Sequence, residues 1–153
     1  MLIFIMWLGS VFIKAARAEG NQIAVEKGDY FDCCEGWYDT KQLDLYICDL
    51  IGQGYSLTYG LYDEAGELIG ISLGYIKHWF RGTEYIINEL CIKTERQGNG
   101  AGTFFIREIE KAIKELGLKQ IFLLTDSNVP AYQFYKKNGF VQCETNVAFA
   151  KVL

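Results

Sequence analysis

A glycine-rich loop between an apolar strand and an amphipathic helix constrains the fold of this chain more than any other feature. Tyr85–Ile92 is apolar and rich in β-branched residues, as is typical of a buried strand. Gly98, Gly100 and Gly102 follow it, and a helical pattern then runs to a stop at Gly117. Such a loop leaves backbone N–H groups bare beside the positive end of the helix dipole, so it predicts a site for a phosphate or pyrophosphate. The apolar positions expected on the helix are Phe105, Ile109, Ala112 or Ile113, and Leu116.

Two common nucleotide motifs do not fit this loop. A P-loop would end in Gly-Lys-Ser/Thr, whereas Gly102 is followed by Thr103 and Phe104. The dinucleotide fingerprint would require a glycine where Thr103 stands. The pattern that fits is Gln97-x-x-Gly100-x-Gly102, which resembles the acetyl-CoA motif of the GCN5-related N-acetyltransferase (GNAT) family.

A second block downstream resembles the same family. It follows the strand-like segment Ile121–Thr125 and matches the pattern Asn-x-x-Ala-x-x-Phe-Tyr-x-x-x-Gly-Phe. Two motifs in the right order and at the right separation make the resemblance specific over Tyr55–Leu153, and residues 30–54 follow it loosely. The matching residues are Asn128, Ala131, Phe134, Tyr135, Gly139 and Phe140.

The resemblance implies an α/β (α+β) fold of the GNAT type, with a mixed, mostly antiparallel sheet and helices on both faces. The 153 residues suit a single domain, 1–153. The other expected elements are a hairpin of Ser56–Tyr62 and Leu68–Tyr75 turning at Asp63–Glu67, a loop over Lys77–Gly82, a short helix begun by Asn128 and Pro130, and tail strands Phe140–Glu144 and Val147–Val152.

The first half of the chain is less clearly patterned. The apolar segment Met1–Ile13 is expected to be a first strand or helix packed on the core, although Ala16-x-Ala18 would also suit cleavage of a secretory signal. We expect a helix around Gln22–Lys27 and another from Asp39 to Gly52. In the resembled family this region walls the acceptor site, so aromatic residues here would either touch substrate or pack into the core. They are Tyr30, Phe31, Trp37 and Tyr38.

Composition narrows the range of partners. The net charge of −4 and pI near 5 argue against nucleic acid, which requires a basic surface. The five cysteines contain no Cys-x-x-Cys pair and there is one histidine, so we expect no metal site and reduced cytoplasmic thiols. His78 has no recognisable nucleophile context and is expected to be structural.

Two residues are the expected catalytic groups. Glu89 is an acidic residue in an otherwise apolar strand, and period-two alternation would place it on the same side as Ile87 and Cys91. The resemblance implies that Glu89 is the general base, acting through water. It also implies that Tyr135 hydrogen-bonds the CoA sulfur and protonates it as the general acid.

The resemblance further implies how acetyl-CoA is held. The backbone of Leu90, Cys91 and Ile92 would pair with the pantetheine amides, and Asn128 and Ala131 would line that arm. Tyr132 would lie on the adenosine side. The pyrophosphate would be held by Gln97, Gly98, Asn99, Gly100, Ala101, Gly102 and Thr103.

We therefore expect a cytoplasmic N-acetyltransferase that moves acetyl from acetyl-CoA to a primary amine, with no membrane partner. The acceptor would be a small polycationic amine, such as a polyamine or aminoglycoside, or a peptide amine. Homodimers are common in the family and would suit this chain too. The alternatives are a non-catalytic CoA-binding regulator with the same fold and, more distantly, a secreted binding module.

Overall fold

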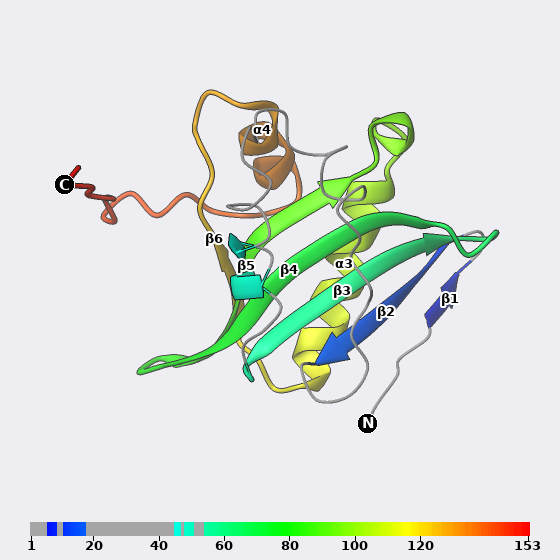
Figure 1. The fold of residues 1–153 in the computed structure, drawn as a ribbon, viewed down its shortest axis with the longest axis horizontal. Helices are drawn as coiled ribbons and strands as arrows, with labels where there is room; N and C mark the ends of the chain where they lie inside the picture. Colours follow the sequence, from blue (N-terminus) through cyan, green and yellow to red (C-terminus); the bar gives the residue numbers. More distant parts are fainter. Residues whose placement is uncertain (1–5, 9–10, 18–44, 47, 51–53) are drawn as a thin grey trace.

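The computed structural model describes residues 6–8, 11–17, 45–46, 48–50 and 54–153, and shows one six-stranded sheet in the order β1-β2-β3-β4-β5-β6 (Figure 1). Each of the first four strands pairs antiparallel with the next, and β6 runs parallel to β5. This confirms the mixed, mostly antiparallel sheet. The strands are β1 (Met6–Leu8), β2 (Val11–Arg17), β3 (Ser56–Asp63), β4 (Leu68–Trp79), β5 (Gly82–Ile92) and β6 (Gln120–Leu123).

Helical segments lie on both faces of the sheet, as expected. Helix α3 (Ala101–Glu115) covers one face and buries its apolar stripe against β3 and β5 (Figure 1). Residues 45–46 and 48–50 are helical and lie on the opposite face, where Leu50 is buried. The expected helix Asp39–Gly52 agrees with the structure at those positions; the expected helix Gln22–Lys27 lies outside the described residues.

The apolar start of the chain contributes two strands to the sheet. β1 and β2 pair from Met6–Ile13 to Leu8–Val11, and β2 continues along β3 from Val11–Asp63 to Arg17–Leu57. The strand alternative is therefore the correct one. Among the described residues, no helix combines the length and the apolar character needed to cross a membrane.

The β4–β5 hairpin is longer than the sequence predicted. The expected loop Lys77–Gly82 is wrong, because only Phe80 and Arg81 form the turn. His78 Nδ1 lies 3.1 Å from Thr83 Oγ1 on the paired strand, and Lys77 Nζ lies 4.4 Å from the Trp79 ring centroid. Contacts between exposed polar and aromatic side chains extend the pairing of β4 with β5 here. Such contacts produce no alternation of apolar residues, so the sequence pattern did not indicate the extra strand length.

Both helices that follow β5 differ from expectation at their ends. Leu116 forms the C-cap of α3 and is exposed, so Leu118, which is buried, takes the place expected for it in the core. Helix α4 (Pro130–Lys137) has Val129 as its N-cap, not Asn128, and no side chain caps it. The residue before a proline favours the extended conformation, which Val129 adopts.

The two tail strands expected at Phe140–Glu144 and Val147–Val152 are absent: residues 140–153 form neither strand nor helix. A strand is stable only when a neighbouring strand takes up its backbone hydrogen bonds. Among the described residues, no strand pairs with the tail, whose first part lines a cavity beside β6.

Candidate active site

A β-bulge at Asn88 shapes the region where the sequence placed the catalytic base. Leu73 of β4 is opposite Glu89 and Gly74 is opposite Ile87, so Asn88 is the extra residue in β5. Bulges bend the strand that carries them. The pairing of β5 with β6 ends at the same point, with Ile87 opposite Leu123. Beyond the bulge, this edge of β5 therefore pairs with no other strand among the described residues.

The bulge also changes the face to which Glu89 points. Ile87 belongs to the core beneath α3, and Leu90 packs against the same core. Glu89 and Cys91 lie opposite Leu73 and Ile71, which are outside that core cluster. The prediction that Glu89 shares a side with both Ile87 and Cys91 is thus right for Cys91 and wrong for Ile87, since the extra residue reverses the alternation.

Tyr46 is the partner of Glu89 on this second face. Its phenol donates a short hydrogen bond to Oε1 of Glu89, across forty-three positions of sequence. The helical segment that carries Tyr46 is fixed to the sheet, because Ser56 Oγ donates to the Leu50 carbonyl at 3.2 Å and Leu50 is buried. The sequence analysis did not single out Tyr46 as a site residue. The one sign in the sequence was that Tyr46 is a tyrosine among otherwise mainly aliphatic residues on the apolar face of the helix expected from Asp39 to Gly52.

Tyr135 lies close enough to Glu89 and Cys91 to interact with both. Burial, followed by the smaller effects of the nearby Cys91 and Glu89, raises the pKa of the Tyr135 phenol from 10.0 to about 12. Its ring packs edge-on between Phe134 and Phe140, with both centroid distances 5.3 Å. The structure therefore brings together the two predicted catalytic residues, which come from β5 and α4.

The glycine loop has the shape predicted for anion binding. Gly98 and Gly100 adopt positive φ angles of 75° and 85°, and no atom would lie within 4 Å of a Cβ at either position. Gly100 is the N-cap of α3, and the first-turn amides of a helix have no intrahelical acceptor. Open space thus lies next to amides that need a partner. Gln97 tethers the loop to β5, since its Nε2 donates to the Ile92 carbonyl at 2.9 Å.

Gly102 has a different role, because it joins the two motifs. A Cβ on Gly102 would lie 3.0 Å from the ring of Phe134 in α4. A glycine at this position avoids a tight contact between α3 and the Phe134 ring of α4. The second motif is therefore held against the first helix turn of the glycine loop.

The cations beside the loop are already paired. Lys93 Nζ lies 3.0 Å from Glu67, and Arg96 contacts Asp63 at 2.8 Å and Glu67 at 3.6 Å. Both carboxylates belong to the β3–β4 turn. An anion at the loop would thus be held mainly by backbone amides, not by these side chains.

The free edge of β5 offers backbone groups at alternate residues. Lys93 N donates to the Ile69 carbonyl at 2.9 Å, so Lys93 faces β4. By alternation, Cys91 also turns its backbone toward β4, while Leu90 and Ile92 turn theirs to the free edge. Two of the three residues expected to pair with the pantetheine thus face outward, and Gln97 already occupies the Ile92 carbonyl.

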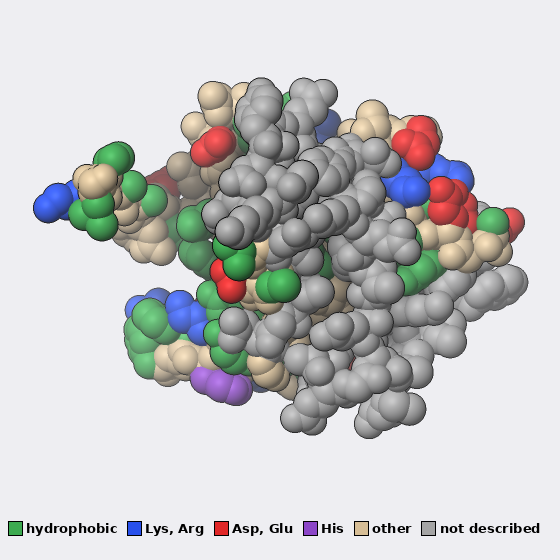
Figure 2. Space-filling model, viewed as in Figure 1, with side chains coloured by type: hydrophobic (Ala, Val, Ile, Leu, Met, Phe, Trp, Pro, Cys, Tyr) green, Lys and Arg blue, Asp and Glu red, His purple; other side chains and the backbone are tan. Residues whose placement is uncertain are grey.

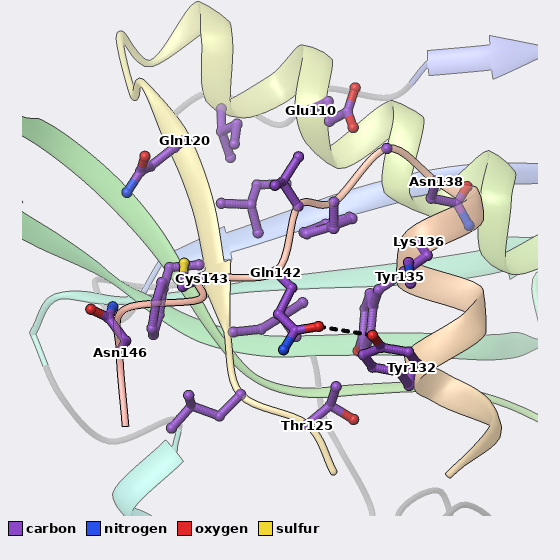
Figure 3. Close-up of a pocket in the computed structure, with 18 of the residues that line it drawn as sticks. Glu110, Gln120, Thr125, Tyr132, Tyr135, Lys136, Asn138, Gln142, Cys143 and Asn146 are labelled. Atoms are coloured by element: carbon purple, nitrogen blue, oxygen red, sulfur yellow. Dashed lines mark hydrogen bonds between the residues drawn. The ribbon is translucent and has the colours of Figure 1, made fainter. Parts of the chain in front are cut away.

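The remaining predicted residues surround the start of α4. Asn128 is exposed in the turn before the helix, and Ala131 is partly buried in its first turn. The Tyr132 hydroxyl donates to Gln142 Oε1 in the tail at 2.8 Å (Figure 3). Tyr30, Phe31, Trp37 and Tyr38, expected near the substrate, lie outside the described residues.

A large cavity elsewhere in the molecule does not coincide with this site. It measures about 810 Å³ and lies between α3, β6, α4 and the tail (Figure 3). Tyr132 and Tyr135 line it, whereas Glu89 and the glycine loop do not. A second cavity of about 640 Å³ includes Asp49, Tyr75 and Asn88, on the face to which Glu89 points.

None of the three described cysteines, Cys48, Cys91 and Cys143, forms a disulfide with another described residue, and Cys91 is the buried one of the three. Within the described ranges, no three His, Cys, Asp or Glu side chains cluster closely enough to hold a metal ion.

Comparison with known proteins identifies the architecture. Residues 24–140 match the family model described as the acetyltransferase (GNAT) family. No curated protein matches the sequence significantly. An aminoglycoside acetyltransferase from an uncultured soil metagenomic sample, in complex with trehalose, has a TM-score of 0.66 at 16% identity, covering 94% of this chain and 96% of that chain.

Two further solved structures show the same fold. A putative acetyl transferase from Pyrococcus furiosus has a TM-score of 0.68 at 19% identity, covering 92% of this chain and 99% of that one. The aminoglycoside antibiotic 6'-N-acetyltransferase from Acinetobacter baumannii has a TM-score of 0.66 at 18% identity, covering 94% and 99%.

Proposed function

Because this chain belongs to the acetyltransferase (GNAT) family, we propose that it transfers an acetyl group from acetyl-CoA to a primary amine. The observation that carries the proposal is that Glu89 and Tyr135 lie near each other beside the free edge of β5. The same strand continues into the glycine loop. A proton acceptor, a hydrogen-bond donor and an anion site would then lie along the course of one bound acetyl-CoA molecule. The use of acetyl-CoA suits a cytoplasmic enzyme.

Acetyl-CoA would lie along the opening between β5 and β6. Its pyrophosphate would accept hydrogen bonds from the amides of residues 98–103, and its pantetheine amides would pair with Leu90 and Ile92 as an added strand. Asn128 and Ala131 would border the pantetheine arm, with Tyr132 toward the adenosine. The thioester then reaches the level of Glu89 and Tyr135.

Proton removal from the acceptor is the first chemical requirement. An amine with a pKa near 10.4 is neutral in about one molecule in a few thousand at pH 7, which adds roughly 4–5 kcal/mol to the barrier. Glu89 would take this proton through water. Tyr46 holds Oε1 of the carboxylate, which leaves Oε2 to face the water. Tyr46 would act as a positioning residue.

Departure of the thiolate is the second requirement. The neutral amine attacks the thioester carbon and forms the carbon–nitrogen bond. The carbon–sulfur bond breaks with its electron pair leaving on sulfur, and the proton that the nitrogen then loses passes to the thiolate. A thiol has a pKa of about 8.5. The Tyr135 phenol, with its pKa near 12, is the weaker acid, so its main contribution would be a hydrogen bond to the developing thiolate. Tyr135 would therefore act mainly as a hydrogen-bond donor, whereas the sequence analysis expected it to protonate the sulfur fully.

The acceptor would be a small polycationic or aminoglycoside-like amine, or a peptide amine. The net charge of −4 favours a cation, whereas the second cavity is lined by one carboxylate, Asp49, and one ammonium, Lys77. Similar folds include an aminoglycoside acetyltransferase solved in complex with sisomicin. These points support a small polyamine or amino sugar over a peptide.

Release of free thiol from acetyl-CoA with a panel of amines tests the proposal. We expect acceptor-dependent release, strongly reduced in Glu89→Gln. Saturable CoA binding without release by any amine would instead favour a non-catalytic CoA-binding regulator. Product mass spectrometry, showing a stable acetyl group on the amine, separates transfer from hydrolysis.

A further inference from the structure

The connection between β3 and β4, residues 63–67, lies beside the segment that leads into the glycine loop. Arg96 donates to Asp63 Oδ2 at 2.8 Å and lies 3.6 Å from Glu67 Oε2. Lys93 Nζ lies 3.0 Å from the other oxygen of Glu67. In Figure 2, basic and acidic side chains meet at the upper right, at the end of the sheet where Figure 1 draws both connections. Four charged side chains thus join two segments that are distant in the sequence.

Asp63 is the centre of this contact. Its Oδ1 accepts hydrogen bonds from the backbone amides of Ala65 and Glu67, both at 3.0 Å, and its Oδ2 accepts one from Arg96. Its side chain is 14% exposed, whereas those of Arg96 and Glu67 are 45% and 49% exposed. An ion pair to a largely buried carboxylate that is hydrogen-bonded at both oxygens is screened less than a fully exposed pair. One side chain therefore closes the turn and also holds the segment before the glycine loop.

The glycine loop depends on its ends for a fixed conformation. Nothing lies within 4 Å of a Cβ built on Gly98 or Gly100, and glycine can adopt many backbone conformations. The segment before the loop is η1 (Thr94–Arg96), a single turn of 3-10 helix, so the position of Arg96 sets where the loop begins. If only a fraction of the molecules has the loop amides in place, the apparent Kd for an anion is the intrinsic Kd divided by that fraction.

We propose that Asp63 is a positioning residue for acetyl-CoA: through Arg96 it holds the glycine loop in the conformation that receives the pyrophosphate. This inference rests on the proposed function, in which the loop binds the cofactor. Electrostatics alone predicts the opposite effect of Asp63, because a carboxylate near a polyanionic ligand disfavours its binding. The direction in which CoA affinity changes when this charge is removed therefore separates the two roles.

The first test measures the Kd for CoA of Asp63→Asn by calorimetry. The asparagine oxygen can still accept from the amides of the turn, so the substitution mainly removes the ion pair with Arg96. We expect the Kd to rise about five- to tenfold, as when about a tenth to a fifth of the molecules keeps the loop in place.

Glu64→Gln is the matched control for this measurement. It removes the same charge from the same turn, at an exposed residue that forms no ion pair with a described residue. Its Kd for CoA should equal that of the wild type or be slightly lower.

The second test determines whether Asp63 acts through Arg96. Arg96→Gln should raise the Kd for CoA about as much as Asp63→Asn, and the double variant should bind CoA no more weakly than either single variant. In turnover, Asp63→Asn should raise the KM for acetyl-CoA and leave kcat unchanged. The KM for S-acetylpantetheine, which lacks the pyrophosphate, should stay the same, whereas a general loss of structure would raise both KM values.

Amide hydrogen exchange of the ligand-free chain tests the holding of the loop without any cofactor. The amides of Arg96 and Gln97 donate to backbone carbonyls three residues earlier, at 2.8 and 3.2 Å. In Asp63→Asn we expect both amides to exchange at least about fivefold faster, because local opening of this segment exposes them to water. In Glu64→Gln their rates should equal those of the wild type.

Three results would overturn the proposal. The first is a Kd for CoA that is unchanged or lower in Asp63→Asn. The second is an additive loss of CoA affinity in the double variant, and the third is unchanged amide exchange at Arg96 and Gln97. A wild-type chain that binds no CoA would instead contradict the proposed function, and the exchange rates would still decide whether Asp63 holds the loop.

Discussion

At the scale of single residues, the bulge at Asn88 has the largest consequence for the proposed chemistry. It turns Glu89 away from the α3 core and toward Tyr46 and Tyr135. A strand without the extra residue would direct this carboxylate into the core, where an unpaired charge is costly. Because Glu89 lies in β5 and the bulge reverses the direction of its side chain, its carboxylate faces the site.

Glu89→Gln should lower kcat by about 10²–10⁴-fold, the usual contribution of a general base. The KM for acetyl-CoA should change little, because the cofactor contacts remain. Glu84→Gln is the control: Glu84 lies on the same strand, is buried, and accepts a hydrogen bond from Gln120 that an amide oxygen can also accept. Equal losses in both variants would contradict the assignment.

Tyr46→Phe removes only the hydroxyl that holds Oε1 of Glu89. We expect kcat to fall about 10–30-fold with an unchanged KM for acetyl-CoA. The hydrogen bond that is lost goes to a charged group and is worth about 1.5–2 kcal/mol, the lower part of the usual range for such bonds. In Glu89→Gln the same substitution should have little further effect. Additive losses in the double variant would show that Tyr46 acts elsewhere. Tyr62→Phe, near the β3–β4 turn, controls for loss of a phenol.

Sequence reasoning named Glu89 because it is an acidic residue in an otherwise apolar strand, and it named Tyr135 because that residue lies in the second motif. It was insufficient for Tyr46, since the contact depends on how a helix docks onto the sheet. The predicted orientation of Glu89 was right relative to Cys91 and wrong relative to Ile87 for a related reason. A bulge depends on how two strands pair, and a period-two pattern in one strand does not reveal it.

At the scale of elements, the glycine loop and its helix are the part most fully predicted. The conformation of the glycine loop and the start of the helix depend on residues that are adjacent in the sequence, so both can be predicted from the sequence. The long β4–β5 hairpin and the unpaired tail were not predicted correctly. The first depends on cross-strand contacts of exposed side chains, and the second depends on whether a partner edge is available.

Gly100→Ala tests the loop as an element. The substitution adds a Cβ in open space at a φ of 85°, where the pyrophosphate would lie, and should raise the Kd for CoA at least about tenfold. Gly117→Ala, at the other end of α3, is its matched control: φ is 79° and the space around it is also open. Both should lose similar stability, and only Gly100→Ala should lose CoA affinity. Similar CoA affinities would contradict the loop assignment.

At the scale of the whole molecule, buried phenols should make the fold sensitive to alkaline pH. Burial raises the pKa of Tyr135 from 10.0 to about 12, and it raises the pKa of Tyr85 as well. Below pH 10 these phenols are protonated in both states. Above it, only the unfolded chain releases the protons, so stability should fall as the pH rises from 10 toward 12.

Urea unfolding at pH 8 and pH 11 measures this loss. Tyr135→Phe should reduce the drop in unfolding free energy by roughly 1–2 kcal/mol, since one pKa unit corresponds to about 1.4 kcal/mol. Tyr132→Phe, whose hydroxyl contacts Gln142 on the exposed tail, should leave the drop unchanged. Equal drops in wild type and Tyr135→Phe would show that this phenol is not buried in the folded chain.

Calorimetric titration with acetyl-CoA tests the central claim most directly, because every proposed step begins with the loop of residues 97–103 gripping the pyrophosphate. We predict a saturable site with one acetyl-CoA per chain and a dissociation constant below about 1 mM, retained in Glu89→Gln and weakened in Gly100→Ala. No saturable heat at millimolar acetyl-CoA would contradict the account.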